Sequence, residues 1–296
     1  MTEDSTIQPS ASSIDRENAE IAARLDEAAA LLEEQGASHF RITAYRRAAR
    51  EIATLDRPVR EIYRQGGEDA MVALPGIGHS IAGAAGQMLD TGRWPMLNRL
   101  RGESRPEVLF QTLPGVGPDL AQKIHDTLHV DTLEALELAA YDGRLEQVPG
   151  IGPRRQAAIR DTISARLSRR LTDRRRSAQP EPSAELLLDV DRIYRDRASR
   201  SALPLIAPKR FNPRGERWLP ILHLDRDGWY FTVLFSNTAM AHRLGRTHDW
   251  VVIFFSQDHS GEGQRTVVTE TRGPLEGQRV IRGREAECRA LARDRA

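Results

Sequence analysis

Leu74-Pro75-Gly76-Ile77-Gly78 is the first of three copies of one short motif, followed by Leu113-Pro114-Gly115-Val116-Gly117 and Val148-Pro149-Gly150-Ile151-Gly152. Each copy comes after a short amphipathic segment and precedes a second helical segment. Proline ends the first segment, and the glycines permit positive φ angles and the close approach of a ligand to the backbone. The apolar side chain of the central Ile or Val is suited to burial in the hydrophobic core. The repeat therefore predicts three helix-hairpin-helix elements.

The backbone of such a hairpin is suited to binding a phosphate. Amide groups at the start of the second helix point outward, where the helix dipole favours an anion. A DNA phosphodiester fits this site without any reading of base edges, so binding should be independent of sequence and sensitive to salt. The candidate contacts are Gly76, Ile77, Gly78, His79 and Ser80; Gly115, Val116, Gly117 and Lys123; and Gly150, Ile151, Gly152, Arg154 and Arg155.

The residues that follow each hairpin rank the three candidate sites. Two cations, Arg154 and Arg155, follow the third hairpin, whereas neutral donors follow the first. Asp119 follows the second hairpin and would repel a phosphate, an effect that Lys123 offsets in part. The alternative for any one hairpin is a packing unit that does not touch DNA.

Composition excludes several classes of protein. The 296 residues include 43 basic and 42 acidic side chains, and 40% of the chain is hydrophobic, which excludes a wholly disordered protein. The single cysteine, Cys288, excludes an internal disulfide framework and a multi-cysteine zinc site. The acidic, polar N-terminus is unlike a signal peptide, and no segment is apolar enough to span a membrane. We therefore expect a cytoplasmic, nucleoid-associated protein without a membrane partner.

The hydropathy pattern changes half-way along the chain. Before residue 168 it is helical, whereas residues 219–224, 228–235, 250–255, 265–271 and 278–283 are typical of strands. This predicts a multi-domain protein, with an all-α tandem helix-hairpin-helix N-terminal half and an α+β C-terminal domain around a mainly antiparallel sheet of four or five strands. The expected parts are a disordered lead-in (1–17), a helical domain with the first hairpin (18–102), a tandem hairpin region (103–168), a linker (169–185) and the α+β domain (186–296).

Residues 18–168 resemble the lyase-type and fingers regions of family X DNA polymerases, as bacterial members carry them. The likeness rests on Phe40-Arg41…Ala44-Tyr45-Arg46-Arg47-Ala48-Ala49 together with the three hairpins. It implies a domain that grips the phosphate and broken end of gapped or nicked DNA, with His39, Tyr45, Arg46 and Arg47 near the strand end. The alternative for these four residues is a solvated basic helix face with the tyrosine in the core. The resemblance also implies a monovalent cation at a hairpin, and no cofactor is expected to be required.

Two features of the family are missing. Eukaryotic members place the lyase lysine on the helix after the first hairpin, where this chain has Ala84, and an alanine cannot form a Schiff base. The polymerase palm needs a Gly-Ser turn before an Asp-x-Asp strand, but Asp189-Val190-Asp191 follows no Gly-Ser and lies in a helical pattern. The sequence therefore favours a DNA-binding protein with a role in DNA repair that is non-catalytic in its N-terminal half.

The second half leaves alternatives open. A structure-specific nuclease, or an abasic-site or deoxyribose-phosphate lyase, could have its active site there, and an interaction scaffold with unknown protein partners is a third class. Side chains at strand ends that suit Mg²⁺ or Mn²⁺ are His223, Asp225, Asp227, His248, Asp249, Asp258, His259 and Glu270. Arginines that could share one sheet face and follow a phosphate backbone are Arg265, Arg272, Arg279, Arg282 and Arg284, with a solvated sheet face as the alternative.

Overall fold

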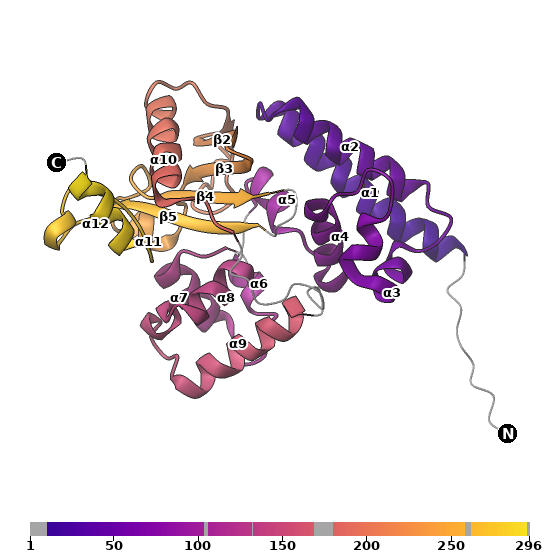
Figure 1. Ribbon diagram of the computed structural model, residues 1–296, viewed down its shortest axis with the longest axis horizontal. Coiled ribbons are helices and arrows are strands. Elements are labelled where there is room, and N and C mark those ends of the chain that lie inside the picture. The colour runs from indigo at the N-terminus through magenta and orange to yellow at the C-terminus, as the bar shows by residue number, and fades with distance from the viewer. Residues whose placement is uncertain (1–10, 104–105, 132, 169–179, 258–261, 295–296) are drawn as a thin grey trace.

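The computed structural model describes residues 11–103, 106–131, 133–168, 180–257 and 262–294. Two helical groups and one antiparallel sheet make up this part of the chain (Figure 1). The predicted fold class is thereby confirmed, since helices precede residue 168 and all strands follow it. Most of the linker predicted at 169–185 lies outside the described residues. The domain boundaries remain a prediction.

The first helical group surrounds the first hairpin. It contains α1 (Ala11–Glu34), α2 (His39–Ala53), α3 (Val59–Val72), α4 (His79–Thr91) and α5 (Pro95–Leu100). Gly36 adopts a φ of 71° after α1, and the Oγ of Ser38 caps α2 by accepting a hydrogen bond from the Arg41 amide at 3.4 Å. The helical turn is interrupted inside α3 at Gly66 and Gly67.

The second helical group carries the other two hairpins. It contains α6 (Pro106–Phe110), α7 (Pro118–Leu128), α8 (Leu133–Tyr141), the 3₁₀ helix η1 (Arg144–Gln147) and α9 (Pro153–Ser168). Phe110, Ile124, Leu136 and Leu145 are fully buried in a core of its own, which also holds the hairpin residues Val116 and Ile151. This group therefore folds around its two hairpins.

The C-terminal half is a meander, because each strand pairs with the next one along the chain. Its elements are α10 (Ala184–Ser199), β1 (Leu205–Ile206), β2 (Leu219–Arg226), β3 (Trp229–Phe235), α11 (Ala239–Arg243), β4 (Val251–Ser256), β5 (Gly263–Thr269), the 3₁₀ helix η2 (Gly273–Leu275), β6 (Arg279–Ile281) and α12 (Glu285–Asp294). The five predicted strands correspond to β2–β6. The sheet has a sixth strand, β1, which has only two residues and so produces no alternation that a sequence pattern could reveal.

The first helical group and the sheet share one hydrophobic core. At its centre, the guanidinium of Arg99 lies 3.3 Å from the ring centroid of Phe254 and pairs with Glu262 through two hydrogen bonds of 2.8 and 2.9 Å. His223 on β2 hydrogen-bonds to Oε1 of Gln35 at 3.0 Å and to Thr232 at 3.1 Å. Buried charges and imidazoles need such partners, so these contacts specify how the sheet docks on the helices.

The second helical group is attached to the same sheet. Gln264 on β5 donates to the carbonyl of His129 at 2.6 Å and accepts a hydrogen bond from the amide of Asp131 at 2.8 Å. The side chain of Gln264 is buried, so this pairing is protected from water. The sheet thus touches both hairpin-bearing groups.

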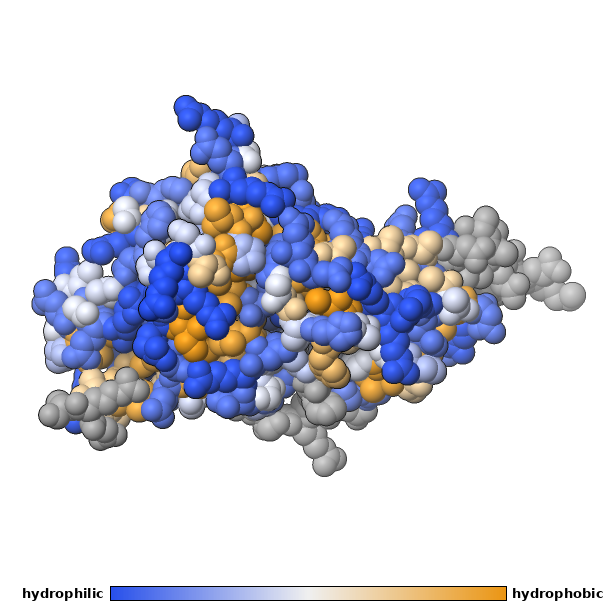
Figure 2. Space-filling view, turned by 90° about the horizontal axis from the view of Figure 1, so that it is seen from above, coloured by the Kyte–Doolittle hydropathy of each residue, from blue (hydrophilic) through white to orange (hydrophobic). Residues whose placement is uncertain are grey.

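Hydrophilic side chains cover most of the face shown in Figure 2, and apolar side chains gather in separate patches between them. Within the described ranges, none of the helices combines the length and the apolar character that crossing a membrane would need.

The buried imidazole of His223 predicts a loss of stability in acid. Burial, together with the positive charges of Arg41 and Arg99, holds the pKa of His223 well below its usual value of 6.5, so the folded protein keeps it neutral. Below pH 6.5 the unfolded chain takes up a proton that the folded chain does not, and stability falls. Relative to His223→Gln, the unchanged protein should lose about 1.4 kcal/mol more between pH 7.5 and 5.5. Urea unfolding at both pH values measures this, and equal losses would contradict the prediction.

Candidate nucleic-acid interface

The three hairpins share one turn geometry. Their first glycines, Gly76, Gly115 and Gly150, have φ angles of 76°, 76° and 92°, which only glycine adopts readily. The amide of the central residue donates to the carbonyl of Leu74, Leu113 and Val148 at 3.2, 3.1 and 3.1 Å, respectively. Those central residues, Ile77, Val116 and Ile151, are buried, as the sequence predicts. The repeat seen in the sequence is thus a repeat of backbone conformation.

The second glycine of each hairpin begins the following helix. The carbonyls of Gly78, Gly117 and Gly152 accept the amides of Ala82, Ala121 and Gln156 at 2.9, 2.9 and 3.0 Å. A β-carbon at any of these three glycines would meet no atom within 4 Å, so the backbone is open to a ligand. The first amides of α4, α7 and α9 have no intrahelical acceptor and carry the positive end of the helix dipole. Pro118 and Pro153 remove one such amide from the second and third hairpins.

Arg47 distinguishes the first hairpin from the other two. A β-carbon on Gly76 would come within 2.7 Å of Cδ of Arg47, whereas Gly115 and Gly150 have no neighbour within 4 Å. The side chain of Arg47, on α2, therefore lies against the first turn, although Arg47 is 29 residues before Gly76 in the chain. Its Nε also lies close to Gly76, so the first turn carries a cation that the other two turns lack at this position.

The other candidates on α2 lie elsewhere. Tyr45 is 5% exposed, its hydroxyl donates to Sδ of Met96 at 3.4 Å, and burial raises the pKa of Tyr45. Arg46 pairs with Glu33 at 2.5 Å, and Nε2 of His39 lies 3.3 Å from Oγ1 of Thr43. Of the four residues that the resemblance places near a strand end, the structure brings Arg47 to a hairpin, and Tyr45 belongs to the core.

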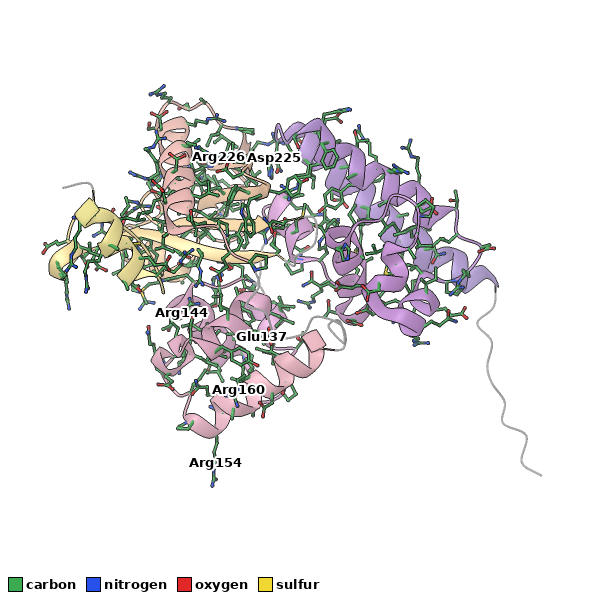
Figure 3. The ribbon with its side chains drawn as sticks, viewed as in Figure 1. Glu137, Arg144, Arg154, Arg160, Asp225 and Arg226 are labelled. Atoms are coloured by element: carbon green, nitrogen blue, oxygen red, sulfur yellow. The ribbon has the colours of Figure 1, made fainter. Side chains whose placement is uncertain are left out.

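Two arginines at the third hairpin have different surroundings. Nη1 of Arg155 donates to the carbonyl of Gly150 at 2.9 Å, which braces the turn. Arg154 extends from the start of α9 into solvent (Figure 3) and forms no ion pair within the described residues. A monovalent cation at a hairpin needs free carbonyl oxygens, so the third hairpin, whose carbonyl already faces a guanidinium, does not fit that ion.

The second hairpin has Asp119 and Lys123 on the exposed side of α7. Its buried side contains His125, whose Nε2 lies 2.9 Å from Oδ1 of Asp131. Burial lowers the pKa of His125, but the hydrogen bonds to Asp126 and Asp131 outweigh it and raise the pKa to about 9. Burial and the neighbouring charge of His125 lower the pKa of His129 to about 4. At neutral pH a charged imidazole therefore lies beside a neutral one.

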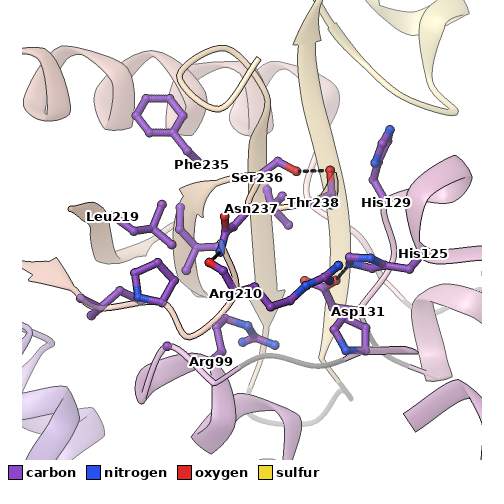
Figure 4. A pocket seen from close by; sticks show the side chains of 16 residues that line it. Arg99, His125, His129, Asp131, Arg210, Leu219, Phe235, Ser236, Asn237 and Thr238 are labelled. Carbon is purple, nitrogen blue, oxygen red and sulfur yellow. Dashed lines mark hydrogen bonds and ion pairs between the residues drawn. The ribbon is translucent and has the colours of Figure 1, made fainter. Parts of the chain in front are cut away.

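These histidines line a cavity of about 50 Å³ between α7 and the sheet (Figure 4). Arg210 reaches from the β1–β2 connection toward Asp131, and the amide of Asn237 donates to the carbonyl of Arg210 at 3.1 Å. Arg99, on α5, also lines this cavity. Both helical groups and the sheet therefore contribute residues to its wall.

Of the five arginines that could share a sheet face on the last two strands, four form ion pairs within the protein. Acidic side chains pair with them: Arg265 with Glu181, Arg279 with Asp191 and Asp249, Arg282 with Glu270, and Arg284 with the nearby Glu287. Such pairs neutralise the charge that a phosphate backbone would need. The sequence could not reveal them, since most partners lie far away along the chain.

The candidate metal ligands are likewise not brought together. His223 is buried against Gln35, Asp249 pairs with Arg279, and Glu270 pairs with Arg282. Asp258 and His259 lie outside the described residues. Among the residues that are described, no three His, Cys, Asp or Glu side chains form a group able to hold a metal ion.

The structure shows the positions that correspond to the lyase lysine and to the palm aspartates of the family. Ala84 is 8% exposed on α4. Asp189 and Asp191 lie on α10, as predicted, where Val190 between them is fully buried. Asp189 pairs with Arg226 (labelled in Figure 3), and Asp191 pairs with Arg279 at 2.6 Å.

Comparison with known proteins identifies the same hairpin regions. Residues 16–94 match the helix-hairpin-helix domain, and residues 107–164 match the SAM-like helix-hairpin-helix tandem. The N-terminal region carries helix-hairpin-helix domains. It is also 28% identical over 137 residues to the DNA polymerase/3'-5' exonuclease PolX of Bacillus subtilis (strain 168). The match covers 46% of this chain and 23% of PolX, so the chain spans less than a quarter of that relative.

These similarities confirm the resemblance to family X polymerases in the N-terminal part of the chain. They support DNA binding and a context of DNA repair or polymerase function. Residues that sequence reasoning missed are Arg99 and Gln264, which hold the hairpin groups to the sheet. A polar residue at an inward position of a strand is the one signal that marked Gln264.

Two substitutions in the first hairpin should separate folding from DNA binding. Gly76→Ala should destabilise the protein by at least about 1 kcal/mol, because alanine disfavours the φ of 76° and its methyl group collides with Arg47. Gly78 has φ −87° and ψ 169°, which serine adopts easily as a helix cap. Gly78→Ser should preserve stability but weaken DNA binding, since the hydroxyl accepts the same amides as a phosphate.

Thermal unfolding and fluorescence anisotropy with a labelled duplex measure the two effects. Unchanged DNA affinity in folded Gly78→Ser would show that the amides of the first hairpin do not bind phosphate.

Proposed function

We propose that this protein binds DNA through backbone phosphates, independently of sequence, and prefers gaps, nicks or ends in a repair-related role. The observation that supports this most directly is the shared geometry of the three hairpins, each with an open glycine beside the first amides of a helix. The similarity to helix-hairpin-helix domains supports the same ligand. We place this activity in the cytoplasm, on the nucleoid.

The attachment of two hairpin groups to one sheet supports the preference for broken DNA. Arg99 and Gln264 hold the first and second groups to the sheet through buried contacts. The two groups therefore present their phosphate sites in a set relative orientation. Bending DNA to match a rigid surface costs free energy, and a nick or gap lowers that cost.

A non-catalytic helical half is also part of the proposal. A buried alanine at position 84 provides no amine for Schiff-base chemistry. In the C-terminal half, the two aspartates of α10 engage arginines in ion pairs rather than facing a common metal position. Binding, rather than bond cleavage, is the activity that the geometry of these residues supports.

Fluorescence anisotropy with labelled intact, nicked and one-nucleotide-gapped duplexes, over a salt series, tests the proposal. Tighter binding to the broken duplexes, with log affinity falling linearly against log salt, is the expected result. Equal binding to all three would overturn the preference for broken DNA. Absence of binding near physiological salt would overturn DNA binding itself.

Arg154 provides the sharpest single-residue test. Arg154→Ala should weaken binding to all duplexes alike and reduce the salt slope by about 1, because one phosphate contact is lost. Arg200→Ala is the matched control, since Arg200 is also exposed but caps the C-terminus of α10, where it forms an ion pair with Asp196. Identical slopes for both variants would remove the third hairpin from the interface.

A further inference from the structure

Four aromatic rings form a strip on the C-terminal half. The ring of Phe211 lies 4.4 Å from that of His242, His242 lies 6.2 Å from Trp218, and Trp218 lies 6.5 Å from His248. Phe211 is 48% exposed, His248 is exposed, and Trp218 and His242 are half-buried. We call these four residues the aromatic strip. The buried ring of Phe235 supports it from below, 5.5 Å from His248.

The strip is held in position by hydrogen bonds and by backbone strain. Phe211 adopts a φ of 53°, which is costly for a bulky residue and persists only where the surroundings enforce it. Asn237 supplies part of that enforcement, because it donates to the carbonyl of Arg210 at 3.1 Å and contacts Nε2 of His242 at 2.6 Å. With Oδ1 of Asn237 as acceptor, Nε2 of His242 carries the proton. Two neighbouring rings are thus oriented before any ligand arrives.

The border of the strip carries charged side chains of both signs. Segments 209–218 and 238–250 contain six basic side chains, Lys209, Arg210, Arg214, Arg217, Arg243 and Arg246, against the acids Glu216 and Asp249. Carboxylates from packed helices and loops also face it, since Glu103, Glu107 and Glu34 pair with Lys209, Arg210 and Arg217. Arg243, which is exposed beside His242, forms no ion pair within the described residues. Arg214 is 84% exposed but lies 3.6 Å from Glu216, and Arg246 pairs with Asp249. Arg243 is therefore the border cation that is left for a phosphate within the described residues.

We infer that the aromatic strip is a stacking platform for the bases of single-stranded DNA. Exposed rings beside arginines match the chemistry of a strand whose bases stack and whose phosphates are charged. The guanidinium of Arg210 lies 5.1 Å from the ring centroid of Phe211, so cation and ring already share one surface. Unlike a duplex, a single strand exposes its base faces, and that favours it as the occupant.

The position of the strip fits a strand that leaves a duplex. Its α11 packs against α7, the helix that begins at the second hairpin. Asn237, between β3 and α11, and Arg210, in the β1–β2 connection, also line the cavity shared with His125 of α7. DNA held at the second hairpin would therefore lie close to the strip. This site is additional to the proposed hairpin grip and uses different residues.

Anisotropy with a labelled oligothymidylate measures this site. The double variant Phe211→Ala with His248→Ala should bind it at least tenfold more weakly, because stacking on each ring is lost. Intact-duplex binding should stay unchanged. Tyr141→Ala and Phe40→Ala are matched controls, since these aromatic residues are 64% and 66% exposed outside the strip, and both should keep full affinity. Circular dichroism checks that each variant is folded.

Arg243→Glu is a second test of the site that leaves the rings in place. It should also reduce oligothymidylate affinity. Gly78→Ser should have the opposite effect to the strip variants, because it should weaken duplex binding and leave oligothymidylate binding unchanged. The two sets of variants therefore test the hairpin site and the aromatic strip separately. Unchanged oligothymidylate affinity in the folded double variant or in Arg243→Glu would overturn the inference. No oligothymidylate binding by the unaltered protein, as expected if the strip binds a protein, would overturn it as well.

Discussion

A buried guanidinium joins the helical half of this protein to its sheet. Arg99 is 2% exposed, lies against the ring of Phe254 and forms a bidentate pair with Glu262. Removing such a charge from water is costly, and the carboxylate of Glu262 and the ring of Phe254 offset that cost, although Nε of Arg99 has no hydrogen-bond partner among the described residues. The pair therefore favours a close contact between α5 and the sheet. Gln264, at the start of β5 and close to Glu262 in the chain, holds the second helical group, so the same region of the sheet contacts both groups that carry hairpins.

Identical turns become different sites through their surroundings. The backbone of each hairpin repeats the same φ angle and the same hydrogen bonds, so each offers amides to an anion. The first turn carries the stem of Arg47, the second has Asp119 nearby, and the third is braced by Arg155 while Arg154 remains free. Local electrostatics, rather than backbone shape, would then decide how strongly each hairpin holds a phosphate.

The C-terminal half connects these sites and adds chemistry of its own. Its arginines on β5 and β6 serve internal ion pairs, which stabilise the sheet against α10 and the residues before it. Its exposed rings instead gather where the β1–β2 connection meets α11. A phosphate-binding helical half and a ring-bearing sheet domain are complementary, since one suits the backbone of DNA and the other suits its bases.

The sequence by itself determined the elements that depend on local chemistry. The glycines and prolines of the hairpins, the helix periodicity before residue 168 and the short β-branched and aromatic runs of β2–β6 are short-range patterns, and each predicted its element correctly. Only the tertiary structure decided which distant side chains meet. It buried Tyr45, brought Arg47 to Gly76, neutralised Arg279 and assembled the aromatic strip from two separate segments. Turn and helix preferences act over a few residues, whereas burial and ion pairing depend on packing between segments, which no local pattern encodes.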